Sequence, residues 1–350
     1  MAKQILGVDI GYDTLKLALM SGTQIRKSAV VSMPTNLVRE GRVVSTETMG
    51  ELIRRTMKEN GMRCNTAALV LPNETVFIRN VTMPLMAVDQ LDYNLPYEFR
   101  DYITEELKDY RYDYAVININ TGSDEESEDA EADSEAGESM ELMAVAAPKA
   151  LLEECRELLH KAGLKMVKAA PTVCALQELI RATGEHEAKE YCILDLGYQA
   201  IRMYMFRGDR HVVTRVLEIG MNSLDQVLAE DYNVDIHLAH TYLLSNYEDC
   251  QNKECCQNAY GNITVELMRA LNFYRFSNPD SHLEDIWICG GGAMISPLQA
   301  QIAETLDLHI HQAEELLPAG AKTEEAHTLL QAIGVTLEDK RGGEGRGRRK

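Results

Sequence analysis

The sequence predicts an α/β fold of two related domains facing one cleft, with a small α+β unit inserted into the first domain. A strand–turn–strand stretch occurs twice, at residues 6–20 and 193–206. After each copy, helical and apolar strand patterns alternate, which is typical of helices packed on a mostly parallel sheet. Between residues 84 and 146 the pattern changes, and two alternating strands flank a run of acidic residues. These observations predict two duplicated domains and one insertion.

The two copies of the repeat align with a single offset. Five pairs of residues coincide: Asp9 with Asp195, Gly11 with Gly197, Tyr12 with Tyr198, Lys16 with Arg202, and Gly22 with Gly208. Glycine lets a turn bring backbone N–H groups close to an anion, and the preceding carboxylate can hold the water shell of a metal. A single Asp-x-Gly turn also simply joins two strands in many hairpins. Two such turns in register, each opening one half of the chain, favour a phosphate site.

Composition sets the class of protein. The chain has 350 residues and 45% hydrophobic content, enough for two or more domains with sizeable cores. It runs from Met1 directly into a strand, and no apolar run reaches membrane-spanning length, so we expect a cytoplasmic protein. The eight cysteines lack a disulfide-like spacing. Cys250, Cys255 and Cys256 lack the Cys-x-x-Cys spacing of structural zinc sites, so zinc is not favoured.

Charge is unevenly distributed. The net charge is −20, and nine of the acidic residues fall within residues 124–138. Without them the remainder is about −11, which argues against general nucleic-acid binding. We expect residues 122–139 to form a disordered acidic hairpin tip. Residues 339–350 are basic and glycine-rich, and are expected to form a disordered tail that binds anionic lipid or RNA only weakly.

The first domain is predicted at residues 1–83 and 147–187. Apolar patterning gives the following elements: strands at 4–10, 14–20, 25–32, 67–71, 75–83 and 164–169, and helices at 46–60, 148–162 and 172–182. The strand at 67–71 is continuously apolar, as a buried parallel strand requires. The insertion at 84–146 is predicted to hold a helix near 91–102, interrupted by Pro96, and strands at 110–119 and 140–147.

The second domain is predicted at residues 188–338. It repeats the three opening strands and then carries a helical subdomain at 221–284, with helices at 221–230, 236–245 and 261–276. An apolar strand at 285–289 leads into three successive glycines and a further helix. A strand at 306–311 and a helix at 323–337 complete the domain.

The duplicated hairpin and the late Gly-Gly-Gly-Ala turn resemble the actin-like ATPase superfamily, whose fold duplicates a ribonuclease H-like domain. Further stretches make the chain similar to the PilM family of type IV pilus assembly, relatives of the division protein FtsA. These stretches are residues 6–11, 97–99, 109–114, 145–149, 161–164, 218–220, 271–275 and 290–293. The resemblance covers nearly the whole chain, apart from the acidic tract and the basic tail. The position of the insertion also resembles PilM and FtsA rather than actin.

The resemblance implies that ATP and Mg²⁺ bind between the two halves. The residues that match this site are Asp9, Gly11, Tyr12, Asp13, Thr14, Lys16, Asp195, Gly197, Glu266, Arg269, Gly290, Gly291 and Gly292. Asp9 and Asp195 would hold the metal, and the glycines would admit a flat base. Glu266 and Arg269, one helical turn apart, could reach the ribose and base, but such a pair is equally common on a solvent-exposed helix face.

The resemblance also implies a partner, the N-terminal cytoplasmic tail of an inner-membrane PilN-like protein. The chain would then lie at the inner face of the membrane through partners, and self-association is left open. The family's peptide groove adjoins the insertion, where the matching residues are Met83, Leu85, Leu91, Leu95, Tyr97 and Phe99. Each of these could instead be ordinary core packing of a small subdomain.

Several departures bear on nucleotide chemistry. Tyr12 and Asp13 stand where the family favours small hydroxyl residues, and Asp13 would repel phosphate unless it points away. The second turn has the bulky Tyr198, and Ala170 replaces the acid that helps to orient water. We therefore expect no catalytic residue and weak or absent hydrolysis. A scaffold without nucleotide and an FtsA-like division protein are the alternatives, and a sugar or acetate kinase is disfavoured.

Overall fold

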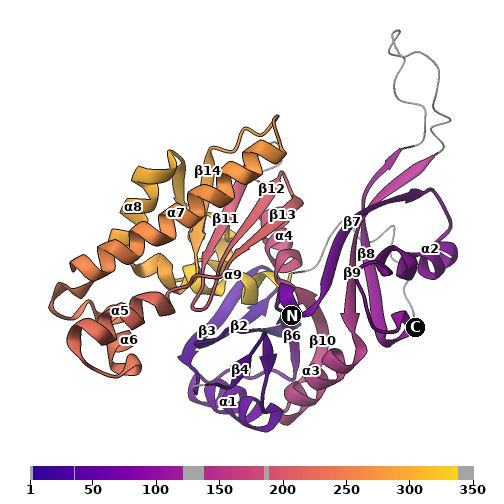
Figure 1. Cartoon of the computed structure of the whole chain (residues 1–350). Helices are drawn as coiled ribbons and strands as arrows, with labels where there is room; N and C mark the ends of the chain where they lie inside the picture. The colour runs from indigo at the N-terminus through magenta and orange to yellow at the C-terminus, as the bar shows by residue number, and fades with distance from the viewer. Residues whose placement is uncertain (1–2, 35, 121–137, 185–188, 338–350) are drawn as a thin grey trace.

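The computed structural model describes residues 3–34, 36–120, 138–184 and 189–337 and has the expected duplicated actin-like fold (Figure 1). The first sheet has five strands in the order β10 (Lys165–Pro171), β6 (Thr66–Leu71), β1 (Gln4–Ile10), β2 (Thr14–Ser21) and β3 (Gln24–Ser32). The strands β1, β2 and β3 pair antiparallel, whereas β6 and β10 run parallel to β1.

The second sheet repeats this order. Its strands are β13 (Arg210–Leu217), β12 (Ile201–Arg207), β11 (Glu190–Leu196), β14 (Asp285–Cys289) and β15 (His309–Gln312). Again the first three strands along the chain are antiparallel and the later two parallel. The repeat seen in the sequence is therefore a repeat of topology.

Helices cover the first sheet. They are α1 (Thr46–Glu59), α3 (Lys149–Lys161) and α4 (Thr172–Thr183), and a short hairpin of β4 (Val38–Arg39) and β5 (Arg42–Val43) precedes α1. The helix α1 is capped at its N-terminus by Ser45, whose hydroxyl accepts a hydrogen bond from the Thr48 N–H. Its predicted apolar face is buried beside α3, where both helices cover one face of the sheet (Figure 1).

The inserted unit is a three-stranded antiparallel sheet in the order β7 (Phe77–Pro84), β9 (Ser139–Pro148) and β8 (Tyr110–Asn120). The boundary expected at residue 84 needs correction, because β7 pairs with β9 along its whole length from Phe77. The helix expected at 91–102 is α2 (Val88–Asn94) followed by a short 3-10 turn, η2 (Leu95–Phe99). A second 3-10 turn, η3 (Leu107–Asp109), lies just before β8. Pro96, which lacks an N–H donor, prevents the α-helix from continuing. The acidic tip expected at 122–139 lies outside the described residues except for Glu138 and Ser139.

The helices of the second domain are α5 (Asn222–Tyr232), α6 (Ile236–Ser245), α7 (Glu254–Ser277), α8 (Ser296–Leu306) and α9 (Ala326–Gly334). Its short 3-10 turns are η4 (Tyr247–Asn252), η5 (Gly291–Met294), η6 (Ala313–Leu316) and η7 (Ala319–Ala321). The first domain has one such turn among its described residues, η1 (Asn73–Thr75). The helix α7 begins seven residues earlier than expected, at Glu254 rather than Gly261. The last helix is shorter than expected, and the basic tail lies outside the described residues. No described helix is both long and apolar enough to cross a membrane.

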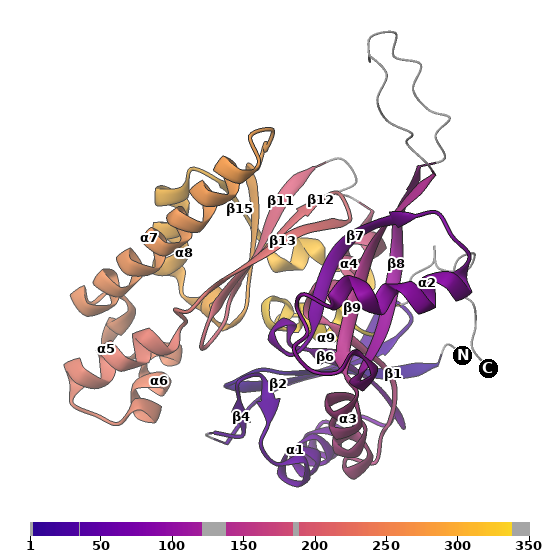
Figure 2. The same ribbon diagram turned by 45° about the vertical axis from the view of Figure 1, so that its right-hand side comes forward.

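The helices α4 and α9 join the two domains (Figure 2). A Cβ atom at Gly7 of β1 would lie 1.7 Å from the carbonyl oxygen of Ala332, so α9 packs directly on the first sheet. A Cβ atom at Gly334 would lie 2.1 Å from the carbonyl oxygen of Ala175 in α4. Leu176 of α4 in turn belongs to the core of the second domain. This crossing brings the two Asp-x-Gly turns near each other, so that Asp195 of the second domain lies close enough to Lys16 of the first to raise its pKa.

Candidate functional site

The two repeated turns are closely similar in structure. The N–H of Gly11 donates to the carbonyl of Thr14 at 3.0 Å and closes the first turn. A Cβ atom at Gly11 would lie 2.8 Å from the Lys16 amine. A Cβ atom at Gly197 would lie 2.6 Å from the carbonyl oxygen of Ala200. Close approach of backbone therefore requires glycine at Gly197, whereas at Gly11 the nearest atom belongs to the mobile end of the Lys16 side chain.

Charge concentrates at the ends of the central strands. The Lys16 amine lies 3.2 Å from Asp9. Burial lowers the pKa of Lys16, but Asp9, Asp195 and Asp13 outweigh this effect, so the pKa is raised. Burial raises the pKa of Asp195, opposed by Arg202 and Lys16. A buried carboxylate of this kind gains stability from a nearby cation, which is the chemistry that Mg²⁺ supplies.

The third part of the site is the glycine turn after β14. Gly290 has φ +86°, and a Cβ atom there would lie 2.4 Å from the Asp195 Oδ1 atom. A Cβ atom at Gly291 would meet no atom within 4 Å. Gly292 packs against Met221, where a Cβ atom would lie 2.5 Å from the sulfur. The turn therefore lies against Asp195, and Gly291 presents an open backbone face.

Tyr12 and Asp13 make contacts that account for their presence in the first turn. The Tyr12 hydroxyl accepts a hydrogen bond from the Gly41 N–H at 2.7 Å, so the ring extends toward the β4–β5 hairpin. The Asp13 carboxylate lies 3.5 Å from Nε2 of His240, whose Nδ1 lies 2.9 Å from Asp225. The nearby carboxylates of Asp13 and Asp225 raise the pKa of His240 to about 10. Asp13 thus faces an imidazolium ion.

A second ion pair crosses the cleft. The Arg202 Nε atom lies 2.8 Å from Glu74, which belongs to η1 at the end of β6 in the first domain. Burial lowers the pKa of Arg202, but Tyr204, Glu74 and Asp195 raise it by more, so the pKa lies above its ordinary value. Asp13–His240 and Glu74–Arg202 each join a first-domain carboxylate to a second-domain cation. We call these two contacts the cleft ion pairs.

Several contributors to the site were missed by sequence reasoning. Glu74, His240, Asp225 and Gln331 belong to neither repeat, and the Gln331 amide lies 3.3 Å from Asp195 Oδ2. Asp225 carried one usable signal, because it interrupts the buried face of α5 with a carboxylate whose side chain is 0% exposed.

Two predicted nucleotide residues are paired with each other and exposed to solvent. Glu266 and Arg269 form an ion pair on α7, with side chains 42% and 70% exposed. Their contact with the ribose and base stays a prediction. Thr14, which opens β2, contributes its backbone carbonyl to the first turn.

Direct metal coordination is limited. Within residues 3–34, 36–120, 138–184 and 189–337, no three His, Cys, Asp or Glu side chains are grouped to hold a metal ion. Asp9 and Asp195 come from different domains and both influence Lys16. A magnesium ion here would therefore be held through its water shell and phosphate oxygens rather than by a protein cage.

The residues predicted to bind a partner fall into two groups. Four of them form the core of the inserted unit: Met83, Leu91, Leu95 and Phe99, at 5%, 3%, 1% and 0% exposed. Leu85 and Tyr97 are 37% and 43% exposed. The core packing of the first four explains their apolar pattern, and leaves only the other two accessible.

The inserted unit also presents aromatic rings that the sequence did not single out. Tyr93 is 69% exposed and stacks edge to face on Tyr97, with ring centroids 5.9 Å apart. Tyr102 is 51% exposed, and the Arg79 guanidinium lies 4.1 Å from its ring centroid. Tyr93, Tyr97 and Tyr102 form what we call the tyrosine patch.

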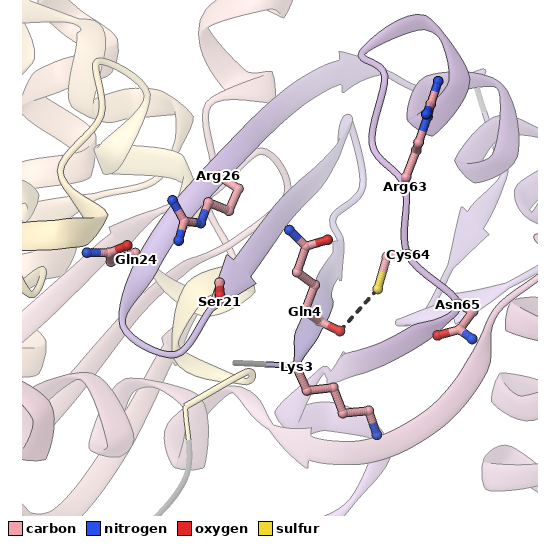
Figure 3. Close-up of a pocket in the computed structure, with 8 residues that line it drawn as sticks. All are labelled: Lys3, Gln4, Ser21, Gln24, Arg26, Arg63, Cys64 and Asn65. Atoms are coloured by element: carbon pink, nitrogen blue, oxygen red, sulfur yellow. Dashed lines mark hydrogen bonds between the residues drawn. The ribbon is translucent and has the colours of Figure 1, made fainter. Parts of the chain in front are cut away.

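Two hollows lie outside the turns. The larger, about 760 Å³, lies at the N-terminal end of the central strand β1, whereas Asp9 lies near the other end of that strand (Figure 3). It is lined by Lys3, Gln4, Ser21, Gln24, Arg26, Arg63, Cys64 and Asn65. The smaller, about 40 Å³, lies between the β4–β5 hairpin and α3. Neither is lined by a residue of residues 11–14 or 197–200.

Comparison with known proteins agrees with this geometry. The family model described as type IV pilus assembly protein PilM matches residues 7–332. A solved structure titled PilM-PilN type IV pilus biogenesis complex has a TM-score of 0.78 at 22% identity, covering 95% of this chain and 97% of that one.

More distant structures share the fold. The ethanolamine utilization protein EutJ from Carboxydothermus hydrogenoformans has a TM-score of 0.58 at 14% identity, over 96% of this chain and 89% of that one. MreB5 of Spiroplasma citri bound to AMPPNP has a TM-score of 0.50 at 12% identity, over 95% of each chain. The family model spans well over half of the sequence, and the chain therefore belongs to the PilM family of type IV pilus assembly proteins.

Proposed function

We propose that this protein is a cytoplasmic actin-like scaffold of the type IV pilus machine that captures the cytoplasmic tail of an inner-membrane PilN-like protein. The observation that carries the proposal is the family match over residues 7–332. The similar solved structure is that of a PilM-PilN complex, which supports a partner of the same kind here. Attachment to the inner face of the membrane would then come through the partner.

The inserted unit is the proposed docking element. Leu85 and the tyrosine patch offer apolar and aromatic surface beside two arginines, Arg79 and Arg100. Exposed tyrosines and arginines are the side chains that most often dominate the free energy of protein association. A short tail with apolar side chains would bury the tyrosine rings, whereas the core residues beneath would hold the surface rigid.

We further infer that ATP with Mg²⁺ binds between the two turns. Lys16 and Arg202 supply positive charge beside the two glycine turns, and the open face at Gly291 suits a flat base. Asp9 and Asp195 would orient the water shell of the metal. A bound nucleotide would supply a polyphosphate that bridges the domains. Ala170 offers no group to orient a water molecule, so turnover would be slow.

A scaffold that works without nucleotide is the second candidate. The cleft ion pairs favour it, because they already join the two domains through opposite charges. Such a protein would hold its docking surface in place at all times. The two candidates differ in whether Mg-ATP stabilises the fold.

The decisive experiment is capture of membrane proteins from detergent-solubilised native membranes, with and without Mg-ATP. Recovery of a single-pass protein with a short cytoplasmic N-terminus supports the scaffold, and recovery of division proteins alone would reject it. In parallel, millimolar Mg-ATP should raise the melting temperature, and Gly291→Glu should abolish the rise by filling the open backbone face. Glu153→Gln, in an exposed ion pair on α3, serves as the matched control. An unchanged melting temperature in the wild type would favour the nucleotide-free scaffold.

A further inference from the structure

The cleft ion pairs raise the question of why carboxylates stand where a phosphate would bind. We propose that Arg202 and His240 are phosphate-binding cations, and that Glu74 and Asp13 occupy them as internal substitutes until a nucleoside triphosphate takes their place. This inference rests on the proposed nucleotide site and adds residues from outside the turn motifs.

The position of Arg202 supports the first half of this exchange. Asp195 lies opposite Arg202 across β11 and β12, as Asp9 lies opposite Lys16 across β1 and β2. A Cβ atom at Gly197 would lie 3.5 Å from Arg202 Nη1, so the guanidinium lies over its own turn. Arg202 is therefore the second-repeat counterpart of Lys16, at the place where phosphate oxygens would meet the backbone.

His240 has one strong partner and one weak one. Asp225 holds Nδ1 at 2.9 Å, and the Tyr198 ring lies edge-on at 5.6 Å, so the second domain fixes the imidazole. The 3.5 Å contact of Nε2 with Asp13 is too long for a well-formed hydrogen bond. Nε2 is buried without a well-formed hydrogen bond in the described structure. The ring therefore keeps Asp225 as its orienting partner, and its other donor faces Asp13 of the first domain.

The carboxylates can leave at modest cost. The side chains of Asp13 and Glu74 are 27% and 33% exposed, so each can regain water by a small rotation. Carboxylate and phosphate oxygens accept hydrogen bonds from the same cationic donors, and a phosphate carries more charge and more acceptor oxygens. Exchange would thus replace an internal contact with a stronger external one, while the domains stay close together.

The exchange predicts an unusual direction for the change in nucleotide affinity when the carboxylates are removed. A ligand that must displace an internal competitor binds more weakly than the open site would allow. Removing the carboxylates should therefore strengthen nucleotide binding, whereas removing the cations should weaken it. If Asp13 and Glu74 instead contributed to the site as ligands, both kinds of change would weaken binding.

The test is calorimetric titration of the full chain with Mg-AMPPNP. We expect the double variant Asp13→Asn, Glu74→Gln to bind about threefold or more tighter than wild type. Arg202→Met and His240→Gln should each bind about tenfold more weakly. Glu153→Gln, which removes a carboxylate from an ion pair far from the cleft, should bind as wild type does. Thermal denaturation of each variant checks that it is folded.

The outcomes separate this inference from the proposed function. Weaker binding by the carboxylate variant, or equal binding by all variants, overturns the exchange and leaves the nucleotide site standing. Absence of binding by every form overturns both. Hydrogen exchange without nucleotide gives an independent measure of the contact itself. Residues 11–14 and 237–241 should exchange faster in the carboxylate variant than in Glu153→Gln, and equal rates would overturn the inference.

Discussion

Lys16 and Arg202 occupy equivalent positions in the two repeats but form ion pairs in different ways. Lys16 pairs with Asp9 in its own hairpin at 3.2 Å, whereas Arg202 reaches across the cleft to Glu74 at 2.8 Å. The duplicated fold thus gives one cation that is kept within its domain and one that joins the domains. This asymmetry links the phosphate-binding turns to the relative position of the two halves.

The same pair of domains meets at the inserted unit. The Asn80 amide of β7 donates to the His211 carbonyl of β13 at 3.3 Å, and Arg210 lies 3.0 Å from Glu141 of β9. The β12–β13 hairpin therefore carries Arg202 at one end and contacts the inserted unit at the other. One hairpin therefore contacts both the first domain, through Glu74, and the inserted unit.

The glycine turn after β14 gives the first prediction. Gly290→Ala should lower the free energy of unfolding by about 1–3 kcal/mol, because φ is +86° and the new Cβ would collide with Asp195 and Leu196. Gly291→Ala is the matched control, since its Cβ would meet no atom within 4 Å. Urea denaturation followed by circular dichroism measures both. Equal losses for the two variants would contradict the prediction.

The inserted unit gives the second prediction, which separates core from surface. Phe99 is 0% exposed, so Phe99→Ala should cost about 3–5 kcal/mol of stability. Tyr97→Ala should leave stability within about 0.5 kcal/mol, because the ring is 43% exposed, yet should reduce capture of the membrane partner. Denaturation and the membrane pull-down report the two effects separately. Normal capture by Tyr97→Ala would move the docking site elsewhere.

Local patterning explains why so much of the fold could be predicted. Alternating apolar residues located the strands that surround Asp9 and Asp195, and the common offset paired their turns. The boundary of the insertion was missed because β7 reads as a strand whichever sheet it joins. It pairs with β9, about sixty residues away in sequence, and its partner sheet is decided by packing rather than by its own residues.

The cleft ion pairs could not be predicted for the same reason. Glu74 and Arg202 are separated by 128 positions in sequence, and the register between the domains is set by the α4–α9 crossing. Asp13 could be recognised as a misfit for phosphate, but not as the partner of His240. The buried Asp225 was the one member of the cluster with a sequence signal, because its charge interrupts the apolar face of α5.

His240 gives the third prediction, on pH dependence. Asp13 and Asp225 raise its pKa from about 6.5 in the unfolded chain to about 10 in the folded protein. The stabilisation from its proton is therefore complete below about pH 6.5 and is lost as the pH rises through about 10. The groups that face the ring are Asp13, Asp225 and Tyr198.

The measurement is the urea midpoint of wild type and His240→Gln between pH 6.5 and 10. Other groups titrate equally in both proteins, so the difference between them isolates His240. We expect wild type to lose its advantage steadily as the pH rises, with the two midpoints converging near pH 10. A difference that stays constant over this range would show that the ring is not charged by its carboxylates.

The α9 joint gives the fourth prediction. Gly7→Ala would place a methyl group 1.7 Å from the carbonyl oxygen of Ala332, an atom of a helix backbone that cannot rotate away. The variant should lose about 3 kcal/mol of stability or more, because β1 and α9 must separate along the interface that joins the domains.

The control is Gly261→Ala, which should raise rather than lower the stability. Its Cβ would lie at an ordinary 3.7 Å from Gln301, and alanine favours the helix by about 0.5–1 kcal/mol. Melting curves should therefore shift down for Gly7→Ala and up for Gly261→Ala. An unchanged melting temperature for Gly7→Ala would mean that α9 does not rest on β1.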